Sequence, residues 1–167
     1  MAMMAYMYAK GQKSGAINGS VTQRGRENSI AVISAAHSIT NPRDPQSGLP
    51  TGQRTHHPFV ATAEVDKATP LLYQVLCTNE SLTSVTFKFW TPQLESPSGV
   101  RSEVQSYTIT LTNANIASID FHLPNIRNPD LQKYPEYTEI AFTYQKIEWV
   151  WTDGGITAGD DWEARNA

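Results

Sequence analysis

Hydrophobic and polar residues alternate along much of this 167-residue chain. Such alternation has the two-residue period of β-strands that bury one face. In the sequence VTFKFW, Val85, Phe87 and Phe89 share one side, and residues 107–111 repeat the same pattern. These two segments are therefore predicted strands.

The alternation changes phase near the end of the chain. The apolar residues fall first on one parity and then on the other: Ile140, Phe142 and Tyr144, followed by Ile147, Trp149 and Trp151. A change of phase inside one apolar run predicts a bulge or corner near Gln145 and Lys146, where a strand crosses from one sheet to the next. Weaker alternation predicts further strands over residues 4–9, 16–22, 29–39, 59–65 and 114–121.

One segment, about residues 67–79, has helical periodicity instead. Its apolar positions recur at the spacing of one helix face: Leu72, Val75 and Leu76. Thr69 is the predicted N-cap with Pro70 at the first helical position, and Asp66 is an alternative cap one turn earlier. The helix is expected to end at Thr78 and the asparagine that follows it.

Short strands with a single helix predict one domain over residues 1–167 that is mainly β. The expected fold is a small antiparallel β-barrel of two sheets, or a two-sheet sandwich, with one flanking α-helix and a long extended loop. That loop is residues 40–58, which lack periodicity and contain four prolines and two glycines. A loop of this length in a compact domain is usually functional or disordered.

The charge balance argues against nucleic acid as a partner. The chain has 13 basic and 16 acidic residues and a formal net charge of −3, so it lacks the positive field that binds a phosphate backbone. Charged residues make up 17% of the chain, below the roughly 25% of typical soluble domains. A polar surface with few charges is suited to contacts between subunits.

Cysteine usage and the N-terminus favour folding in the cytoplasm. Cys77 is the only cysteine, so no intrachain disulfide forms, and its place beside Leu76 predicts a buried, inert thiol. The N-terminal apolar run has no basic region ahead of it and ends at Lys10, which argues against a signal peptide. No segment approaches the ~20 apolar residues of a membrane span, so membrane insertion is not expected.

The stretch SGLPTGQRTHHPF, residues 47–59, is the first candidate for chemistry. A phosphate-binding loop is excluded because its glycines are too close, Gln53 replaces the lysine, and Phe59 begins a strand rather than a helix. The stretch also offers two adjacent histidines, which raise the question of a metal site.

No metal or other cofactor is expected. His56 and His57 are adjacent in an extended segment, so their side chains point to opposite sides. His37 and His122 lie on other elements, and no cysteine or HExxH pattern completes a ligand set. A metal hydrolase that uses the histidine pair remains a weaker alternative.

The chain is not predicted to be an enzyme. It has no G-x-S-x-G nucleophile motif, and Asp153, Asp160 and Asp161 lie in a Gly-rich tail where a solvated turn or cap is expected rather than an acid/base pair. Trp149 and Trp151 are predicted to pack in the core or against another subunit. The alternative is a secreted β-sandwich that binds carbohydrate through Trp90, Trp149 or Trp151.

Several segments, taken in order, resemble the haemolysin-coregulated protein (Hcp) family, the tube subunit of bacterial type VI secretion systems. The segments are GSVTQRGRENSIAVISAAHSI, DPQSGLPTGQRTHHPF, DKATPLLYQVLCTNE, SYTITLTNANIASI, EIAFTYQKIEW and DGGITAGDDW. The resemblance spans nearly the whole chain. Some members carry a toxin domain after the barrel, whereas this chain ends five residues after Trp162, so no fused enzyme is expected.

The resemblance implies a structural role in transport. It implies a β-barrel that closes into homohexameric rings, which stack into a tube inside a contractile sheath and carry a tip (spike) protein. The tube is exported when the sheath contracts, so the implied localisation is cytoplasmic and also secreted without a signal peptide. The implied cargo is small effector proteins held in the ring lumen.

The resemblance also assigns the segment SIAVISAAHS to the wall of the lumen. Ser34, Ala36 and Ser38 share one parity and would form a small, polar surface for effectors, while Ile33, Ala35 and His37 would face the subunit body. The reverse assignment remains open, because Ile30 and Val32 share the parity of the proposed lumen residues.

The long loop matches the extended loop of the family, which reaches toward neighbouring subunits or the next ring. Its prolines would lower the entropy lost on docking. The expected subunit or ring-stacking contacts are Arg43, Asp44, Gly48, Gly52, Arg54 and His56.

Overall fold

The computed structural model describes residues 4–93 and 102–162. These residues form eleven strands and one helix in the following order: β1 (Ala5–Gly11), β2 (Gly15–Ile17), β3 (Ile30–Ala36), β4 (Ile39–Thr40), β5 (Thr55–His56), β6 (Phe59–Glu64), α1 (Thr69–Cys77), β7 (Leu82–Gln93), β8 (Ser102–His122), β9 (Tyr137–Thr143), β10 (Lys146–Trp151) and β11 (Ile156–Asp161). Within the described ranges, no helix is long and apolar enough to cross a membrane. The described part of the chain is therefore mainly β with one helix, as its pattern predicts.

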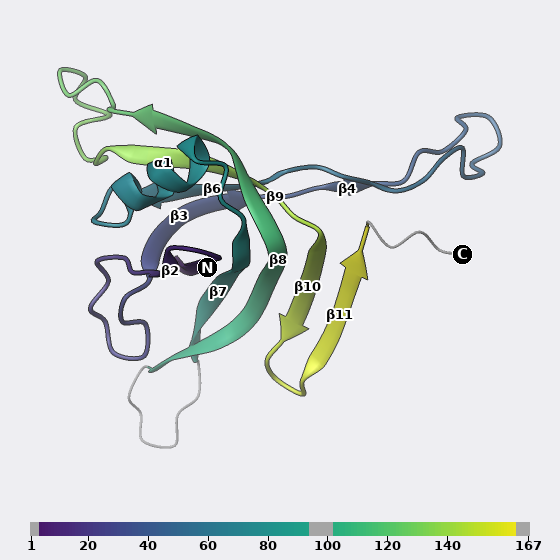
Figure 1. Cartoon of the computed structure of the whole chain (residues 1–167), viewed down its shortest axis with the longest axis horizontal. Coiled ribbons are helices and arrows are strands. Elements are labelled where there is room, and N and C mark those ends of the chain that lie inside the picture. The colour runs from purple at the N-terminus through teal and green to yellow at the C-terminus, as the bar shows by residue number, and fades with distance from the viewer. Residues whose placement is uncertain (1–3, 94–101, 163–167) are drawn as a thin grey trace.

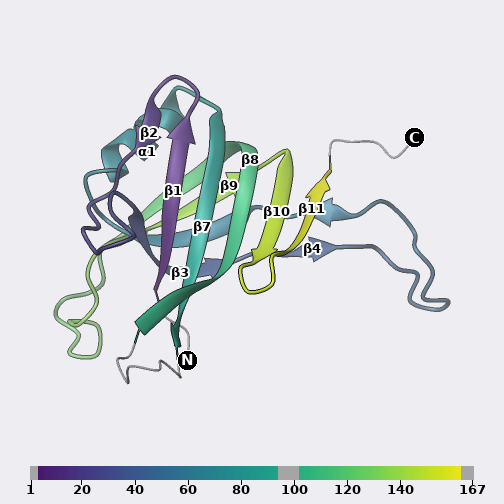
Figure 2. The same cartoon turned by 90° about the horizontal axis from the view of Figure 1, so that it is seen from below.

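Six of the described strands close an antiparallel barrel. The order is β8-β7-β1-β3-β6-β9, and β9 returns to pair with β8. β10 pairs with the edge of β8 that lies opposite β7, and β11 pairs with β10. These two strands form a hairpin outside the ring of strands (Figures 1 and 2). The sheet therefore has both a closed part, which holds the core, and an open extension that ends at β11.

The long strand β8 makes this arrangement possible. Its first half pairs with β7 and with β10, and its second half pairs with β9. The sequence predicts two separate strands here, over residues 107–111 and 114–121, but a single strand runs through both. Asn113 joins them with a φ of 49°. Asparagine tolerates this left-handed backbone, so the strand changes direction without ending.

The barrel core is aromatic at its centre. Phe87 of β7 stacks on Phe59 of β6 at 4.4 Å between ring centroids, and contacts Phe142 of β9 edge to face at 5.9 Å. All three side chains are fully buried. The alternation around Phe87 therefore identifies the inward face of β7 correctly.

The predicted corner near Gln145 and Lys146 is confirmed. β9 ends at Thr143 and β10 begins at Lys146, and the backbone amide of Gln145 donates to the carbonyl of Thr112 on β8. Tyr144 is buried at this corner. The change of parity thus marks the point where the chain leaves the pairing with β6 for the open extension.

Helix α1 begins one residue away from its predicted cap. Ala68, not Thr69, is the N-cap, and it makes no side-chain cap bond. Asp66 instead accepts the Ala68 amide at 2.8 Å, and the Thr69 hydroxyl accepts the Asp66 amide at 3.0 Å. Side chains therefore fix the start from both sides, as in a capping box that begins at Asp66, the alternative cap, two residues before Ala68.

The prediction of a buried thiol is wrong. α1 buries Leu72 and Val75 against the barrel, whereas Cys77 is exposed. Cys77 lies two residues after Val75, which is more than half a turn around the helix. Proximity to Leu76 in the sequence therefore does not place it on the apolar face.

A bulge in β3 explains the mixed parity of that strand. The register with β6 shifts between Val32 and Ser34, so Ile33 has no partner of its own. Ile30 and Val32 are buried before the bulge, whereas residues 33–36 are exposed after it. One extra residue moves the side chains that follow to the other side of the sheet. Ile33 itself is 49% exposed, so its predicted burial against the subunit body is wrong.

The predicted long loop projects from the barrel as a narrow two-stranded arm, residues 39–56 (Figure 1). β4 and β5 pair through only two residues each. Further out, the Thr51 amide donates to the Pro42 carbonyl, and Arg43 bridges to Pro50. The arm is therefore an ordered ribbon whose position depends on what holds it at its root.

Candidate functional site at the root of the arm

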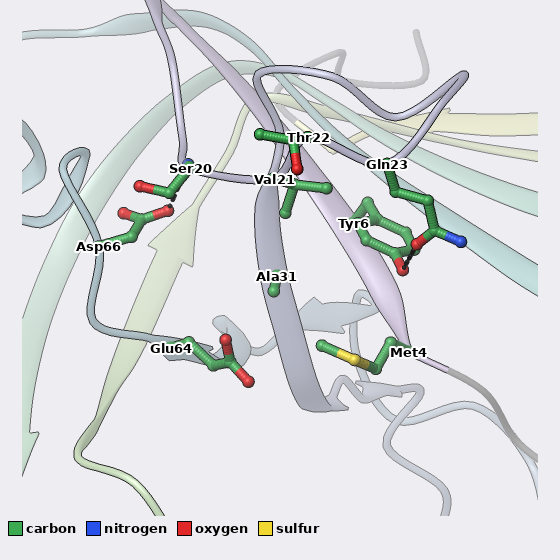
Figure 3. Close-up of a pocket in the computed structure, with 9 residues that line it drawn as sticks. All are labelled: Met4, Tyr6, Ser20, Val21, Thr22, Gln23, Ala31, Glu64 and Asp66. Atoms are coloured by element: carbon green, nitrogen blue, oxygen red, sulfur yellow. Dashed lines mark hydrogen bonds between the residues drawn. The ribbon is translucent and has the colours of Figure 1, made fainter.

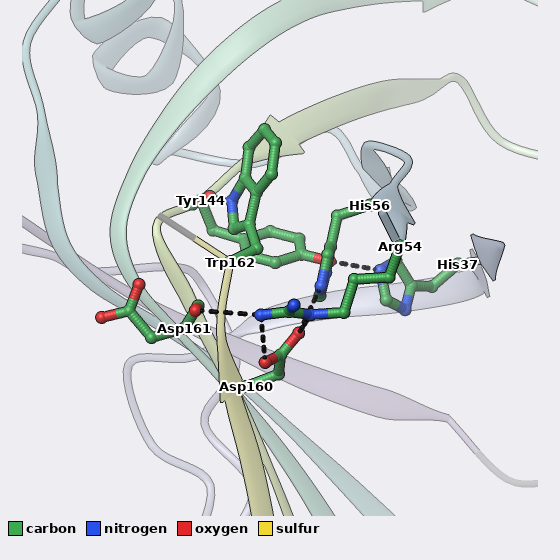
Figure 4. A network of polar contacts seen from close by, with 7 residues as sticks. All are labelled: His37, Arg54, His56, Tyr144, Asp160, Asp161 and Trp162. Atoms are coloured by element: carbon green, nitrogen blue, oxygen red, sulfur yellow. Dashed lines mark hydrogen bonds and ion pairs between the residues drawn. The ribbon is translucent and has the colours of Figure 1, made fainter. Parts of the chain in front are cut away.

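A network of polar and aromatic side chains holds the root of the arm to the barrel (Figure 4). The Tyr144 hydroxyl, at the β9–β10 corner, lies 2.6 Å from Nε2 of His37 and 2.7 Å from Nδ1 of His56. His37 follows β3 at the start of the arm, and His56 lies in β5 where the arm returns. One hydroxyl therefore connects both strands of the arm to the barrel.

Asp160 of β11 extends this network to the open part of the sheet. Its carboxylate lies 2.7 Å from Nε2 of His56 and accepts two hydrogen bonds from Arg54, at 2.5 and 2.8 Å. Arg54 also donates to the Asp161 carbonyl at 3.2 Å. Trp162 covers the cluster, stacking on the His56 ring and donating its indole N–H to the Tyr144 carbonyl. We call His37, Arg54, His56, Tyr144, Asp160 and Trp162 the arm-root network.

Burial, hydrogen bonds and charge shift the pKa of four groups in the network, and the hydrogen bonds to Asp160 raise that of Arg54. The hydrogen bonds from Arg54, and then the contact with His56, lower the pKa of Asp160. Burial, assisted by the negative charge of Asp160, raises the pKa of Tyr144 to about 12. Burial, followed by the charges of His56 and His57, lowers the pKa of His37. At neutral pH the network therefore contains a carboxylate, a neutral phenol and a neutral His37.

The order carboxylate, imidazole, hydroxyl is also the order of a hydrolytic triad, but this site does not suit that chemistry. The His56 side chain is only 2% exposed. Both hydrogen-bonding sides of the Tyr144 hydroxyl already contact histidines. A nucleophile needs an accessible oxygen and a lowered pKa, and Tyr144 has neither. The arrangement instead fixes the arm and β11 to the barrel.

The predicted divergence of the two adjacent histidines is confirmed. His56 points into the arm-root network, whereas His57 points away and its Nε2 lies 3.2 Å from the Thr40 hydroxyl. Within the described part of the chain, no three His, Cys, Asp or Glu side chains lie close enough to hold a metal ion together.

Sequence patterns missed most of the network. The solvated turn expected at Asp160 and Asp161 is wrong, because both residues lie in β11 and Asp160 binds Arg54 and His56. The partners of Tyr144 are 88 and 107 residues away in the chain. Only the phase change at the β9–β10 corner marked Tyr144 as a special position.

The tip of the arm is stabilised by its own turn. The Asp44 carboxylate accepts the Gln46 amide at 3.0 Å and the Ser47 hydroxyl at 2.7 Å, which together lower its pKa. Arg43 donates to the Gly48 carbonyl at 3.3 Å. Gly48 has a φ of 71°, a backbone that favours glycine. The tip residues thus have local roles, and the subunit contacts expected of them and of Gly52 stay predictions.

Arg54 and His56 also have roles within the chain. Both bind Asp160, so their side chains are already used before any neighbour arrives. The predicted lumen residues Ser34, Ala36 and Ser38 are exposed, and Ser34 donates its hydroxyl to Thr62 at 3.1 Å. Whether these three residues line a lumen stays a prediction.

A second polar feature is an open groove beside β1 and β3 (Figure 3). Its lining includes Tyr6, Gln23, Glu64 and Asp66. The Tyr6 hydroxyl donates to Gln23 at 3.0 Å, and Asp66 accepts the Ser20 amide at 3.1 Å. The polar groups of this groove mainly bind one another and hold the loop before β3.

The three tryptophans proposed for carbohydrate binding do not form one platform. Trp90 lies beneath the Arg26 guanidinium at 3.9 Å, and Trp149 packs against the core. Trp151 is exposed, and Tyr107 is its aromatic neighbour at 6.5 Å. The packing prediction thus fits Trp149, and the geometry gives the carbohydrate hypothesis little support.

These features define a class: a small closed β-barrel that carries a projecting two-stranded arm, and whose most organised polar cluster is structural. A family model described as "Type VI secretion system effector, Hcp" matches residues 6–151. The "Major exported protein" of Pseudomonas aeruginosa is 35% identical over 173 residues, covering 98% of each chain. The chain therefore belongs to the Hcp family of the type VI secretion system.

Solved structures of the family have the same fold. A variant of Hcp1 from the Escherichia coli EAEC 042 pathovar is similar with a TM-score of 0.82 and 28% identity, over 96% of this chain and 99% of that one. An Hcp protein gives a TM-score of 0.85 at 30% identity, over 96% and 100%. The secreted protein Hcp3 of P. aeruginosa gives 0.74 at 28%, over 96% and 99%.

Proposed function

We propose that this chain is a tube subunit of a type VI secretion system, which closes into hexameric rings that stack into a tube. The observation that carries the proposal is the family match over residues 6–151, together with a projecting two-stranded arm in a chain of this family. The arm is held at its root by a partly buried network, and most residues beyond the root are exposed, so they offer a surface for a neighbouring copy.

Two different surfaces at opposite ends of the molecule support this assembly. Leu49 at the tip of the arm is 65% exposed. Exposed apolar side chains also gather near the loop between β8 and β9: Phe121, Leu123, Ile126 and Tyr134. The arm and this loop lie at opposite ends of the long axis (Figures 1 and 2). Head-to-tail assembly needs two such distinct, complementary surfaces on each subunit.

In this proposal, the exposed half of β3 lines the lumen of the ring. Ser34, Ala36 and Ser38 are small and exposed, so they offer weak hydrogen bonds and little steric hindrance to an effector protein. The bulge at Ile33 moves the parity of Ser34 and Ala36 to the outer face of the sheet, while Ile30 and Val32 remain in the core. The wall of the lumen and the core of the barrel thus come from the same strand.

Export through the secretion machinery completes the proposal. The relative from P. aeruginosa carries the name of an exported protein, and a family member from that organism is called secreted. We infer that this chain leaves the cell by the same system, with sheath and tip proteins as partners and small effector proteins as cargo. It acts by assembly and carriage and does not catalyse a reaction.

Light scattering after size-exclusion chromatography tests the assembly. A hexamer has a mass near six times the 18.5 kDa of one chain. Leu49→Asp serves as the matched variant, because Leu49 is exposed at the arm tip and its change leaves the core intact. The expected result is a hexamer that is weakened or stacks less in the variant. A strict monomer at every concentration contradicts the proposal.

A further inference from the structure

The hydrogen-bond directions in the arm-root network follow from Asp160. Its carboxylate can only accept, so it takes N–H groups from Arg54 and from Nε2 of His56. A neutral His56 then has a bare Nδ1, which accepts the Tyr144 hydroxyl proton. The Tyr144 oxygen in turn accepts Nε2–H of His37. Every donor in this line has an acceptor, and all bonds point toward Asp160.

The arm-root network can bind one extra proton without losing a hydrogen bond. If His37 is charged, its Nε2–H still donates to Tyr144, and nothing else changes. If His56 is charged, its Nδ1–H donates to the Tyr144 oxygen, and the hydroxyl proton turns to Nε2 of a neutral His37. The network therefore stays satisfied with either histidine charged alone.

A second extra proton leaves the arm-root network with more donors than acceptors. With both histidines charged, two N–H groups point at the same Tyr144 oxygen, and the hydroxyl proton loses its acceptor in a buried position. The two positive nitrogens also lie no farther apart than the combined lengths of their contacts to that oxygen, 2.6 and 2.7 Å. Like charges at this separation repel.

The neighbouring charged groups do not neutralise two charged histidines. Asp160 is the carboxylate that contacts His56, and Arg54 already binds it on both oxygens, while the charge of Asp161 acts on Arg54 as well. His57 lies on the neighbouring side of the arm and adds to the positive charge felt by His37. The Asp161 carbonyl is engaged by Arg54, and Trp162 covers His56 from the outside.

We propose that the arm-root network is a two-proton acid switch, which stays closed while at most one of His37 and His56 is charged and releases the arm when both are charged. β4 and β5 join through only two pairs of residues, and one further backbone bond, from the His57 amide to the Ser38 carbonyl, lies at the root, so the side-chain network supplies much of what fixes the direction of the arm. A second consequence rests on the proposed function: if the arm contacts neighbouring copies, its release also weakens the assembly.

The direction of the pH dependence follows from His37. Its pKa in the folded chain lies below the ordinary value of about 6.5. The neutral His37 therefore contributes stability that is fully present above about pH 6.5 and is lost as the pH falls through the lowered pKa. The closed state is the neutral-pH state, and the released state is the acidic one.

Hydrogen–deuterium exchange of the full chain tests the switch, with labelling times scaled for the intrinsic pH dependence of amide exchange. Between about pH 7.5 and about pH 5, peptides covering residues 37–57 and 156–162 are expected to lose protection at least about tenfold. The profile should be steeper than a one-proton titration. Peptides covering residues 82–90 of the barrel should keep their protection.

His37→Gln separates the switch from a merely structural role. The glutamine amide both donates and accepts but carries no charge, so it satisfies Tyr144 in either state of His56. This variant is expected to keep its arm protected at the acidic end. His57→Gln is the matched control, because His57 contacts Thr40 and not Tyr144: it should still open at acidic pH, with a midpoint moved slightly upward because one positive charge near His37 is removed.

Three outcomes overturn the switch: flat protection in the wild type, a one-proton profile, or loss of protection in His37→Gln at the wild-type pH. If His37→Gln does not fold at neutral pH by circular dichroism, the steepness of the wild-type profile decides alone. Light scattering at each pH is run in parallel. A monomer at every pH contradicts the proposed function, while the exchange profile still decides on the switch.

Discussion

Asp160 is the residue on which the arm root depends most. It binds Arg54 through both carboxylate oxygens and His56 through one of them, so it joins β11 to β5. His56 is buried, and its Nε2–H has no other acceptor in the network. Removal of this carboxylate charge therefore weakens the whole cluster, because buried donors need partners.

Asp160→Asn is expected to destabilise the chain by about 1–3 kcal/mol at neutral pH. The amide keeps the size of the side chain but replaces one acceptor with a donor, which faces the N–H groups of Arg54 and His56. Urea unfolding of both proteins measures the difference. Asp153→Asn, in the exposed turn between β10 and β11, is the control and should change stability little. Equal effects of the two changes would contradict the importance assigned to Asp160.

Tyr144 is expected to ionise later than an ordinary tyrosine. Its pKa is raised to about 12, so the neutral phenol contributes stability below the ordinary value of about 10, and this is lost as the pH rises further. The difference in ultraviolet absorbance between the wild type and Tyr144→Phe isolates this one phenol. A difference signal that appears near pH 10 in the folded chain is the result that contradicts the network.

The core supplies a prediction about the barrel itself. Phe87 contacts both Phe59 and Phe142, so Phe87→Ala is expected to cost about 3–5 kcal/mol of unfolding free energy. Phe121→Ala makes the same chemical change at an exposed position and should stay within about 0.5 kcal/mol. Thermal and urea unfolding compare the two. Similar losses at both positions would show that the barrel is not packed around Phe87.

The elements of the barrel were largely predictable because their signal is local. The alternation at Val85 and Phe87, and the phase change before Lys146, depend only on neighbours in sequence. The bulge at Ile33 was not predictable, because its residues look like an ordinary mixed strand. The arm-root network was missed for a different reason: the contacts of Tyr144 and Asp160 cross about a hundred residues and depend on how the strands meet.

The arm is an element that can be removed without loss of the barrel. Deletion of residues 45–52 takes away the tip but leaves His37, His56 and the β4–β5 pairs in place. The barrel is expected to keep its melting temperature within a few degrees, because a projecting tip adds little to the core. Assembly measured by light scattering should weaken. Unfolding of the deletion variant, or unchanged assembly, contradicts the role given to the arm.

The whole molecule combines a closed barrel with an open extension. The barrel supplies a stable core without free edges among its six strands, while β11 ends the sheet on the outside. The arm and the apolar loop near Phe121 lie at opposite ends, and β3 exposes a small, polar half-strand. This distribution of surfaces fits a subunit that contacts identical neighbours in more than one direction.

Electron microscopy of the purified full chain tests the central claim most directly, because it shows the form of the assembly as well as its size. The account predicts end views of closed, six-fold rings with a central hole, and side views of stacked rings where the arm is intact. Compact single particles without a hole, at concentrations where light scattering is also monomeric, would contradict it.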